Sequence, residues 1–243
     1  MPETKTAVVI GVGPSEGLGA YIAKAAATDG LHVVVAGRTA DVIEGVAAEI
    51  RDGGGQATAV ATDTTDEAAI AQLIETAEAI GAIELAVYNA GNNFPGDFMK
   101  MEAAYFETAW RVGCLGGFLF AQAALKPMLA RGAGSLIFTG ASASMRGRPN
   151  FAAFTAAKAG LRAMAQSLAR EFGPQGIHVG HVVVDGGIAG DKILSRGLKL
   201  VEERGMDGLV GLDGIAESYM FLHRQPRNAW THELDLRTHK ETF

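Results

Sequence analysis

The sequence predicts a single α/β domain, 1–243, in which helices cover both faces of a parallel β-sheet. Short β-branched apolar runs alternate with segments of helical spacing, and a glycine-rich turn follows the first run. Hydrophobic residues make up 48% of the 243 residues and charged residues 20%, which suits a packed core. One domain of this architecture often reaches such a length undivided.

The first half of the chain alternates strand and helix three times. Apolar runs predict buried strands at 6–10, 31–36 and 56–63. Apolar residues at helical spacing predict helices from Leu18, from Asp41 and after residue 63. Thr64 and Glu67 have the spacing of a capping box, so we expect Thr64 to cap the third helix.

The second half continues the pattern. Strands are expected at 83–89, 135–139 and 177–184, and helices at about 101–131, 151–172 and 215–223. Parallel strands joined by helices require right-handed crossovers. The Gly-rich stretch at about 188–212 is expected to be a flexible substrate lid, and about 224–243 to pack at the pocket or an interface. For Trp230 to Glu233 we favour a structural role, since tryptophan commonly anchors interfaces.

Charge and composition exclude several function classes. A net charge of −6 and a pI near 5.5 argue against a nucleic-acid partner. Cys114 is the single cysteine, so no intramolecular disulfide or cysteine metal cluster is expected. His178 and His181 differ by an odd step on a strand, so we expect no metal site there. No signal stretch opens the chain, and its apolar runs read as shorter than the ~20 residues of a membrane span. We therefore expect a cytoplasmic protein without a membrane partner.

The glycine-rich turn between the first strand and its helix points to a dinucleotide. Backbone N–H groups at such a turn bind a pyrophosphate at the positive end of the helix, and glycines avoid obstruction by a Cβ. The alternative is an ordinary turn, which would not require this strand-turn-helix setting. The expected cofactor-binding residues are Gly13, Ser15, Glu16, Gly17, Leu18 and Gly19.

Arg38 favours NADP(H) over NAD(H). It lies just past the second strand, where an Asp or Glu would bind a free ribose 2′-hydroxyl. NAD(H) stays open as an alternative, because Glu16 would repel a 2′-phosphate if its side chain pointed that way. Arg38 as an exposed side chain without a ligand is the other alternative.

On these motifs the chain resembles the short-chain dehydrogenase/reductase family over nearly its whole length. The family's GxxxGxG pattern appears at Gly13, Gly17 and Gly19, and its Asn-Ala-Gly motif appears as Asn89-Ala90-Gly91. The resemblance implies a Rossmann-type doubly wound parallel sheet in three layers, a small-molecule substrate and a homodimer or homotetramer built on the helices before and after the fifth strand. It also implies further cofactor contacts from Asp63, Thr64, Asn89, Ala90, Gly91, Gly186 and Ile188.

The family's catalytic positions are altered. By resemblance Phe154 occupies the place of the tyrosine in the TyrxxxLys motif and Lys158 that of the lysine, which holds the nicotinamide ribose. Ala141 stands at the usual serine, with Ser142 one residue beyond, and Gly113 stands at the usual asparagine. A phenylalanine cannot donate the proton that carbonyl reduction requires. Replacement donors considered are Ser142, Ser144, Thr155 and Tyr88.

Two functions follow as hypotheses. The first is an NADP(H)-dependent oxidoreductase with a degenerate catalytic set, acting on a small carbonyl, imine or alcohol. The second is an NADP(H)-binding protein of the same fold without turnover, such as a sensor or an assembly partner. A pocket that has abandoned nucleotides is disfavoured, because all three glycines are present.

Overall fold

The computed structural model describes residues 4–91, 93–196, 201–203 and 205–241. Seven parallel strands form one sheet in the order β3-β2-β1-β4-β5-β6-β7. The strands are β1 (Lys5–Ile10), β2 (His32–Gly37), β3 (Gln56–Ala61), β4 (Ala82–Tyr88), β5 (Gly134–Ala141), β6 (Ile177–Val184) and β7 (Glu233–Leu236). The order reverses between β1 and β4, and ligands of such sheets bind in the crevice outside the carboxyl ends of the strands at this point.

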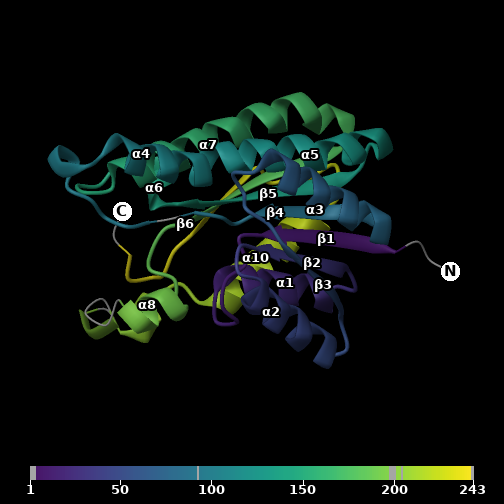
Figure 1. Cartoon of the computed structure of the whole chain (residues 1–243), viewed down its shortest axis with the longest axis horizontal. Coiled ribbons are helices and arrows are strands. Elements are labelled where there is room, and N and C mark those ends of the chain that lie inside the picture. Colours follow the sequence, from purple (N-terminus) through teal and green to yellow (C-terminus); the bar gives the residue numbers. More distant parts are fainter. Residues whose placement is uncertain (1–3, 92, 197–200, 204, 242–243) are drawn as a thin grey trace.

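Helices cover both faces of the sheet, which gives the three-layer doubly wound architecture expected from the sequence (Figure 1). One face carries α1 (Leu18–Thr28), α2 (Ala40–Asp52) and α10 (Leu212–Arg224). The other face carries α3 (Glu67–Ile80), α5 (Gly116–Arg131) and α7 (Ala152–Phe172). Three shorter helices, α4 (Ala103–Trp110), α6 (Ser142–Met145) and α8 (Asp191–Arg196), lie toward the end at which the strands finish.

Each strand contributes to both layers of the core, because successive side chains point to opposite faces of a sheet. In β1, Ala7 and Val9 belong to the cluster beneath α1 and α10, whereas Val8 and Ile10 belong to the cluster beneath α3 and α5. All four are fully buried. Burial on both faces explains the continuous apolar runs in the sequence.

The helical run Ala103–Arg131 is continuous, because α4 passes through a π-helical turn (Arg111–Leu115) into α5. By length and composition it could span a membrane, so the expectation that every apolar run is too short was wrong here. In its most apolar window, 44% of the run is buried inside the protein. A core helix of a soluble protein passes the same test, and Phe120, Ala124 and Met128 pack into the core.

One local expectation was wrong, and one strand was not expected. Asp66, not Thr64, caps α3: its Oδ1 accepts from the N–H groups of Ala68 at 2.9 Å and Ala69 at 3.1 Å. Thr64 is buried instead. The C-terminal segment also forms β7, which pairs with β6 and extends the sheet. The expected lid, about 188–212, includes residues 197–200 and 204, which lie outside the described residues.

Candidate active site

The glycine turn lies at the carboxyl end of β1, where the strand order reverses. A Cβ at Gly19 would lie 2.9 Å from Val12 Cα, and one at Gly17 would lie 2.9 Å from the Pro14 carbonyl oxygen, so neither position admits a side chain without movement. A Cβ at Gly13 would meet no atom within 4 Å. No side chain caps the first turn of α1. Free N–H groups beside open space fit the diphosphate of a dinucleotide.

The polar side chains of the turn are engaged away from that space. Ser15 Oγ donates to Glu49 Oε2 at 2.5 Å, and Lys24 Nζ donates to Ser15 Oγ at 2.7 Å. Glu16 Oε2 accepts from the Tyr21 hydroxyl at 3.1 Å. Leu18 is buried in the core. In this arrangement Ser15, Glu16 and Leu18 have only main-chain atoms to offer a cofactor.

Arg38 follows β2 directly and is exposed. Asp63 lies close to it. Hydrogen bonds from the Thr65 N–H and hydroxyl, both 2.8 Å, are the main cause that lowers the pKa of Asp63, and the positive charge of Arg38 adds to the effect. The guanidinium of Arg38 therefore lies at the surface at the end of β2, near the carboxylate of Asp63.

The Asn-Ala-Gly segment follows β4, and its asparagine ties the sheet together. Asn89 Nδ2 donates to the Gly11 carbonyl at 3.1 Å, and Asn89 Oδ1 accepts from the Thr139 hydroxyl at 3.0 Å. Because the Thr139 hydroxyl donates its one proton to Asn89, the Tyr219 hydroxyl, 2.6 Å away, must be the donor to Thr139 Oγ1. The Asn89 side chain therefore ties the end of β4 to Gly11 and to β5, and the main chain from Asn89 to Gly91 is the part of this segment that is expected to line the cofactor.

Lys158 is buried on α7 beside this segment. Its Nζ donates to the Thr139 carbonyl at 2.7 Å. A Cβ at Gly91 would lie 3.2 Å from Lys158 Nζ, so the glycine leaves the ammonium room at the site. Burial lowers the pKa of Lys158 to about 8, and the charge of Lys192 on α8 adds to this effect. A lysine with such a pKa can exchange a proton near neutral pH.

The other three positions that the resemblance aligns with the family's catalytic residues are Phe154, Ala141 and Gly113. Phe154 is half-buried on α7, and Ala141 ends β5. Gly113 lies in the π-helical turn, where a Cβ would come within 2.7 Å of the Ala157 Cβ. A side chain at residue 113 therefore requires the two helices to move apart.

The replacement hydroxyls are also engaged or buried. Tyr88 is fully buried and donates to the Val112 carbonyl at 2.5 Å. Ser142 hydrogen-bonds to Asp185 and helps to lower the pKa of that carboxyl group. Thr155 Oγ1 is buried. Ser144 Oγ accepts from the Ala141 N–H at 3.1 Å. Of the four positions that the resemblance aligns with the family's catalytic residues, Lys158 is the one with an ionisable side chain.

Sequence reasoning missed a charged cluster at the end of β6. Asp185 is fully buried and accepts two hydrogen bonds, both 2.9 Å, from Arg146. Arg237, just past β7, lies 3.2 Å from the same carboxylate. Glu241 is buried beside Gly186 and 3.8 Å from Arg148. These contacts join segments far apart in the chain, so no local pattern predicts them.

The expected nicotinamide contacts lie directly after Asp185. Gly186 has a φ of +158° and follows β6, and Ile188 pairs with Val210 in an isolated bridge. Hydrogen bonds from Ala189 N–H to the Val210 carbonyl at 3.0 Å and from Val210 N–H to the Gly187 carbonyl at 2.8 Å hold the two ends of the expected lid together. The Asp191 N–H donates to the Glu16 carbonyl at 2.9 Å, so the start of α8 contacts the glycine turn.

A second buried polar network, also missed, links β6, β7 and α7. His181 Nδ1 lies 2.9 Å from Glu233 Oε2, and Glu233 accepts from Arg162 at 2.7 and 2.8 Å. His181 Nε2 lies 3.5 Å from Ser144 Oγ. A Cβ at Gly140 would come within 2.4 Å of His181 Nε2, so the ring packs against a bare main chain. The network fixes α6, which follows Ala141.

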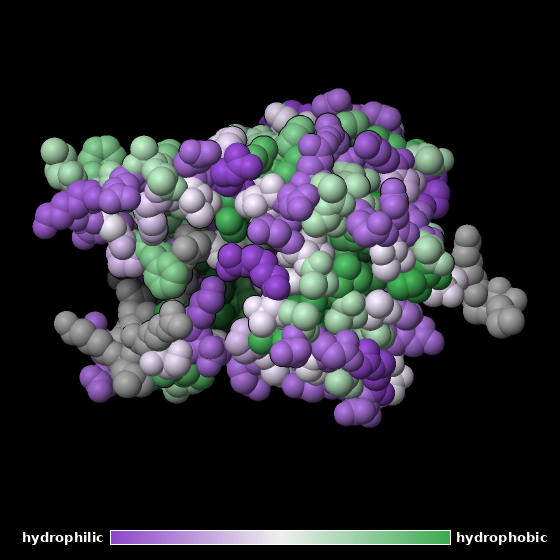
Figure 2. Space-filling view, in the orientation of Figure 1, coloured by the Kyte–Doolittle hydropathy of each residue, from purple (hydrophilic) through white to green (hydrophobic). Residues whose placement is uncertain are grey.

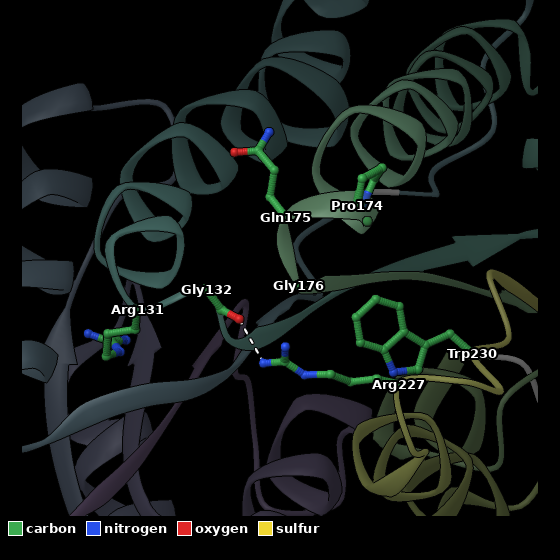
Figure 3. Close-up of a pocket in the computed structure, with 8 residues that line it drawn as sticks. Arg131, Gly132, Pro174, Gln175, Gly176, Arg227 and Trp230 are labelled. Carbon is green, nitrogen blue, oxygen red and sulfur yellow. Dashed lines mark hydrogen bonds between the residues drawn. The ribbon is translucent and has the colours of Figure 1, made fainter.

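A cavity of about 530 Å³, whose lining residues Figure 3 shows, lies elsewhere, next to the amino ends of β5 and β6. Gly132 and Gly176, which line it, precede β5 and β6 rather than follow them. Its arginines are engaged: Arg227 donates to the Gly132 carbonyl at 2.7 Å and Arg131 to Glu78 at 2.6 Å. The cavity therefore takes no part in the site at the glycine turn.

Comparison with known proteins gives relatives of one kind. A family model described as short chain dehydrogenase matches residues 5–191. The short-chain dehydrogenase/reductase eriH of Hericium erinaceus is 35% identical over 176 residues, 70% of this chain and 70% of that protein. The inactive 2-(S)-hydroxypropyl-CoM dehydrogenase 2 of Xanthobacter autotrophicus is 37% identical over 169 residues, 69% of this chain and 72% of that protein.

Solved structures agree with the sequence relatives. A short-chain dehydrogenase from Rhodopseudomonas palustris is 33% identical, with a TM-score of 0.84, and the alignment covers 98% of this chain and 100% of that one. A metagenomic short-chain oxidoreductase in complex with NADP is 26% identical, with a TM-score of 0.80 and coverage of 96% and 97%. With the matched family model, the strand order and the glycine turn, these likenesses show that the chain belongs to the short-chain dehydrogenase/reductase family of oxidoreductases.

Proposed function

We propose that the protein is an NADP(H)-dependent oxidoreductase acting on a small carbonyl, imine or alcohol with a reduced catalytic set. The observation that carries this proposal is Lys158, a buried lysine beside Gly91 at the end of the Asn-Ala-Gly segment. By resemblance this lysine holds the nicotinamide ribose, and its lowered pKa of about 8 also allows it to exchange a proton with a substrate near neutral pH. The cofactor, when bound, supplies the hydride.

NADP(H) is the proposed dinucleotide. The exposed Arg38 at the end of β2 supports it, since a guanidinium binds a 2′-phosphate through charge-assisted hydrogen bonds. Glu16, which could oppose the phosphate, is instead bonded to Tyr21. The structural neighbour with bound NADP is consistent with this choice. We further propose that Ser15, Glu16, Leu18 and the 89–91 main chain contact the cofactor, and that Gly186 and Ile188 flank its nicotinamide end.

Lys158 is the proposed proton donor in place of the missing phenol. In carbonyl reduction the ammonium of Lys158 would give one proton to the substrate oxygen, which would leave a neutral amine at Nζ. Water then returns a proton to Nζ. A pKa of about 8 suits this exchange, because the acid form dominates at pH 7 while the base form remains accessible. Ser142, held by Asp185, is the proposed neighbour on the substrate side.

The test is NADPH consumption across a panel of ketones, aldehydes, cyclic imines and enones, with NADP⁺ reduction across the matching alcohols. We expect turnover with activated carbonyls and iminium compounds, which demand least from the proton donor. Loss of that turnover in Lys158→Met and its survival in Lys126→Met, an exposed lysine of α5, would support the assignment. Tight NADPH binding without turnover on any compound of the panel would contradict it.

The second candidate is a protein that binds NADP(H) without turnover. Phe154, Ala141 and Gly113 favour it together, as does the relative named as inactive. Under this alternative, Phe154→Tyr combined with Ala141→Ser creates an activity that the parent protein lacks. Equal activity in parent and variant would count against it.

Assembly and compartment complete the proposal. Phe106, Trp110 and Phe118 lie partly exposed on α4 and α5, which supports a homodimer or homotetramer that uses the long helices next to β5. The segment 188–212 is the proposed substrate lid, anchored at 187–189 and 210. We place the protein in the cytoplasm, where NADPH is available.

A further inference from the structure

The C-terminal tail crosses the opening of the candidate site. After β7, the tail runs into the space between the part of the protein that carries α4 and α6 and the part that carries α8, where the C-terminus lies (Figure 1). The surface is indented between these two parts (Figure 2). Lys240 Nζ lies 2.6 Å from Asp207 Oδ1 in the lid region, and Arg237 lies 3.2 Å from Asp185 at the end of β6. The tail therefore bridges the two sides of the opening.

Glu241 in this tail is buried in an unexpected way. Its side chain is only 3% exposed, although a carboxylate is normally hydrated at the surface. Its Oε2 would be 3.7 Å from a Cβ at Gly186, which the proposed function places at the nicotinamide end. Its Oε1 is 3.8 Å from Arg148. Burying a carboxylate is costly unless cations compensate for the lost hydration.

The charges around Glu241 explain how that burial is tolerated. Among the described residues of this cluster, the guanidinium groups of Arg146, Arg148 and Arg237 face the carboxylates of Asp185, Asp235 and Glu241. The pKa of Arg146 is raised by its hydrogen bonds to Asp185 first, and by the charges of Glu241 and Asp235 in addition. Removing the charge of Glu241 therefore takes one negative charge away from beside Arg148 and Gly186.

We propose that Arg146 and Arg148 form a carboxylate-binding subsite for the substrate, and that Glu241 occupies this subsite until a substrate displaces it. The substrate class is then an oxo or hydroxy acid, whose carboxylate takes the place of Glu241 while its reacting carbon meets the cofactor. The inference rests on the proposed function for the placement of the nicotinamide next to Gly186. Displacement of the tail also frees Lys240 from its place beside Asp207, so substrate entry loosens the bridge across the opening.

The test compares benzoate with benzamide, which share a shape and differ in charge, by calorimetry on the full chain saturated with NADP⁺. We expect tighter binding of benzoate. Glu241→Gln, which keeps the shape of the side chain, should tighten benzoate binding roughly fivefold and leave benzamide unchanged, because it removes a competing ion of the same charge. Arg148→Gln should weaken benzoate binding by a similar factor. Arg170→Gln, an exposed arginine at the far end of α7, is the matched control and should change neither ligand.

Equal binding of benzoate and benzamide in Glu241→Gln, or no binding of either, would overturn the inference. A preference for benzoate that Arg148→Gln leaves intact would overturn it as well. The NADP⁺ titration that precedes each experiment reports separately on the proposed function: absence of NADP⁺ binding contradicts that function, whereas NADP⁺ binding without discrimination by charge contradicts only the subsite.

Discussion

His181 Nδ1 and Glu233 Oε2 lie 2.9 Å apart and join the two last strands of the sheet through their side chains. Burial lowers the pKa of His181 to about 4, and hydrogen bonds from Arg162 are the main cause that lowers the pKa of Glu233 to about 2. At neutral pH the imidazole is therefore neutral, its Nδ1–H donates to the ionised carboxylate, and its Nε2 is left to accept from Ser144. This order of donors and acceptors anchors β7 and α6 beside the active site.

Replacing Glu233 is expected to destabilise the fold. Glu233→Gln leaves Arg162 without its anionic partner and should lower the free energy of unfolding by about 2 kcal/mol, less than for a fully buried pair because both side chains are about one quarter exposed. Urea denaturation at pH 7 measures the change. Glu107→Gln, which alters an exposed pair with Arg111, is the control and should cost under about 0.5 kcal/mol. Equal effects of the two variants would contradict the assignment.

The same pair predicts how stability depends on pH. A carboxyl group whose pKa falls on folding stabilises the protein above its ordinary pKa of 4.5, and this contribution is lost as the pH falls toward about 2. His181 acts in the same direction. Because its pKa is 6.5 in the unfolded chain and about 4 in the folded protein, the unfolded chain binds the proton more readily, and the free energy of unfolding falls as the pH falls from 6.5 to about 4. The stability difference between the parent and Glu233→Gln should therefore shrink from pH 4.5 downward. A difference that stays constant to pH 3 would argue against an ionised Glu233.

Restoring the missing hydroxyls is expected to raise activity on simple ketones. Phe154→Tyr with Ala141→Ser supplies a phenol one helical turn from Lys158, and general acid catalysis of this kind contributes about 10²–10⁴-fold. Steady-state NADPH oxidation measures the gain. Phe221→Tyr, which adds a phenol at a half-exposed position of α10, should leave the rate unchanged. A double variant no faster than this control would show that the phenol is not the limiting group.

Arg38 is expected to set the choice of dinucleotide. Arg38→Gln removes the charge that faces the proposed 2′-phosphate and should weaken NADPH binding about tenfold to a hundredfold, the range for hydrogen bonds to a charged group, while NADH binding stays the same. Fluorescence titration with both dinucleotides gives the ratio. The matched control is Arg51→Gln, because Arg51 lies on α2 and pairs with Glu44. Parallel losses for NADPH and NADH would remove Arg38 from the specificity site.

Lys158 is expected to destabilise the folded protein, because its charge is buried. The lowering of its pKa from 10.5 to about 8 corresponds to a cost of about 3 kcal/mol for burying the ammonium. Removing the lysine avoids this cost but leaves the Thr139 carbonyl without its hydrogen bond, which offsets part of the gain. Lys158→Met should therefore raise the free energy of unfolding by roughly 1–2 kcal/mol at pH 7. Lys126→Met serves as the exposed comparison. A less stable Lys158→Met would mean that the hydrogen bond to Thr139 outweighs the cost of desolvation.

Activity should follow the ionisation of Lys158. Only the ammonium form can donate a proton, so carbonyl reduction should decline as the pH rises through about 8, and alcohol oxidation should increase over the same range. Rate profiles in both directions from pH 6 to 10 measure the two limbs. In Phe154→Tyr with Ala141→Ser the midpoint should move, since the phenol then carries the proton. A flat profile in the parent protein would exclude Lys158 as the donor.

The sequence predicted the elements whose signals are local. The strand at 177–184 matches β6 at both ends, because a β-branched run buried on both faces is bounded by Gly176 on one side and Asp185 on the other. The helix at 215–223 was too short, since Leu212 and Gly214 carry no marked starting signal. β7 was missed because ELDL alternates charged and apolar residues over only four positions and becomes a strand by pairing with β6.

The candidate site divides in the same way. The sequence reveals Gly13, Gly17, Gly19 and the Asn-Ala-Gly segment because the role proposed for each depends on the main chain of one short stretch. The contacts of Glu241 and of His181 with Glu233 arise between segments brought together only by the fold. Their residue types carry no pattern that a single sequence reveals.

The face of α7 that holds the helix to the sheet consists of Ala153, Ala157, Leu161 and Ala165, and Phe154 is not part of it. Phe154→Tyr adds one hydroxyl group, which turns an inert ring into a proton donor. Because the ring is not part of the packed face, the free energy of unfolding should hardly change. Thermal melting curves would barely distinguish the two proteins. At residue 154, unlike at Lys158, stability and chemistry are independent properties, and only a kinetic measurement tells whether the chemistry has been kept.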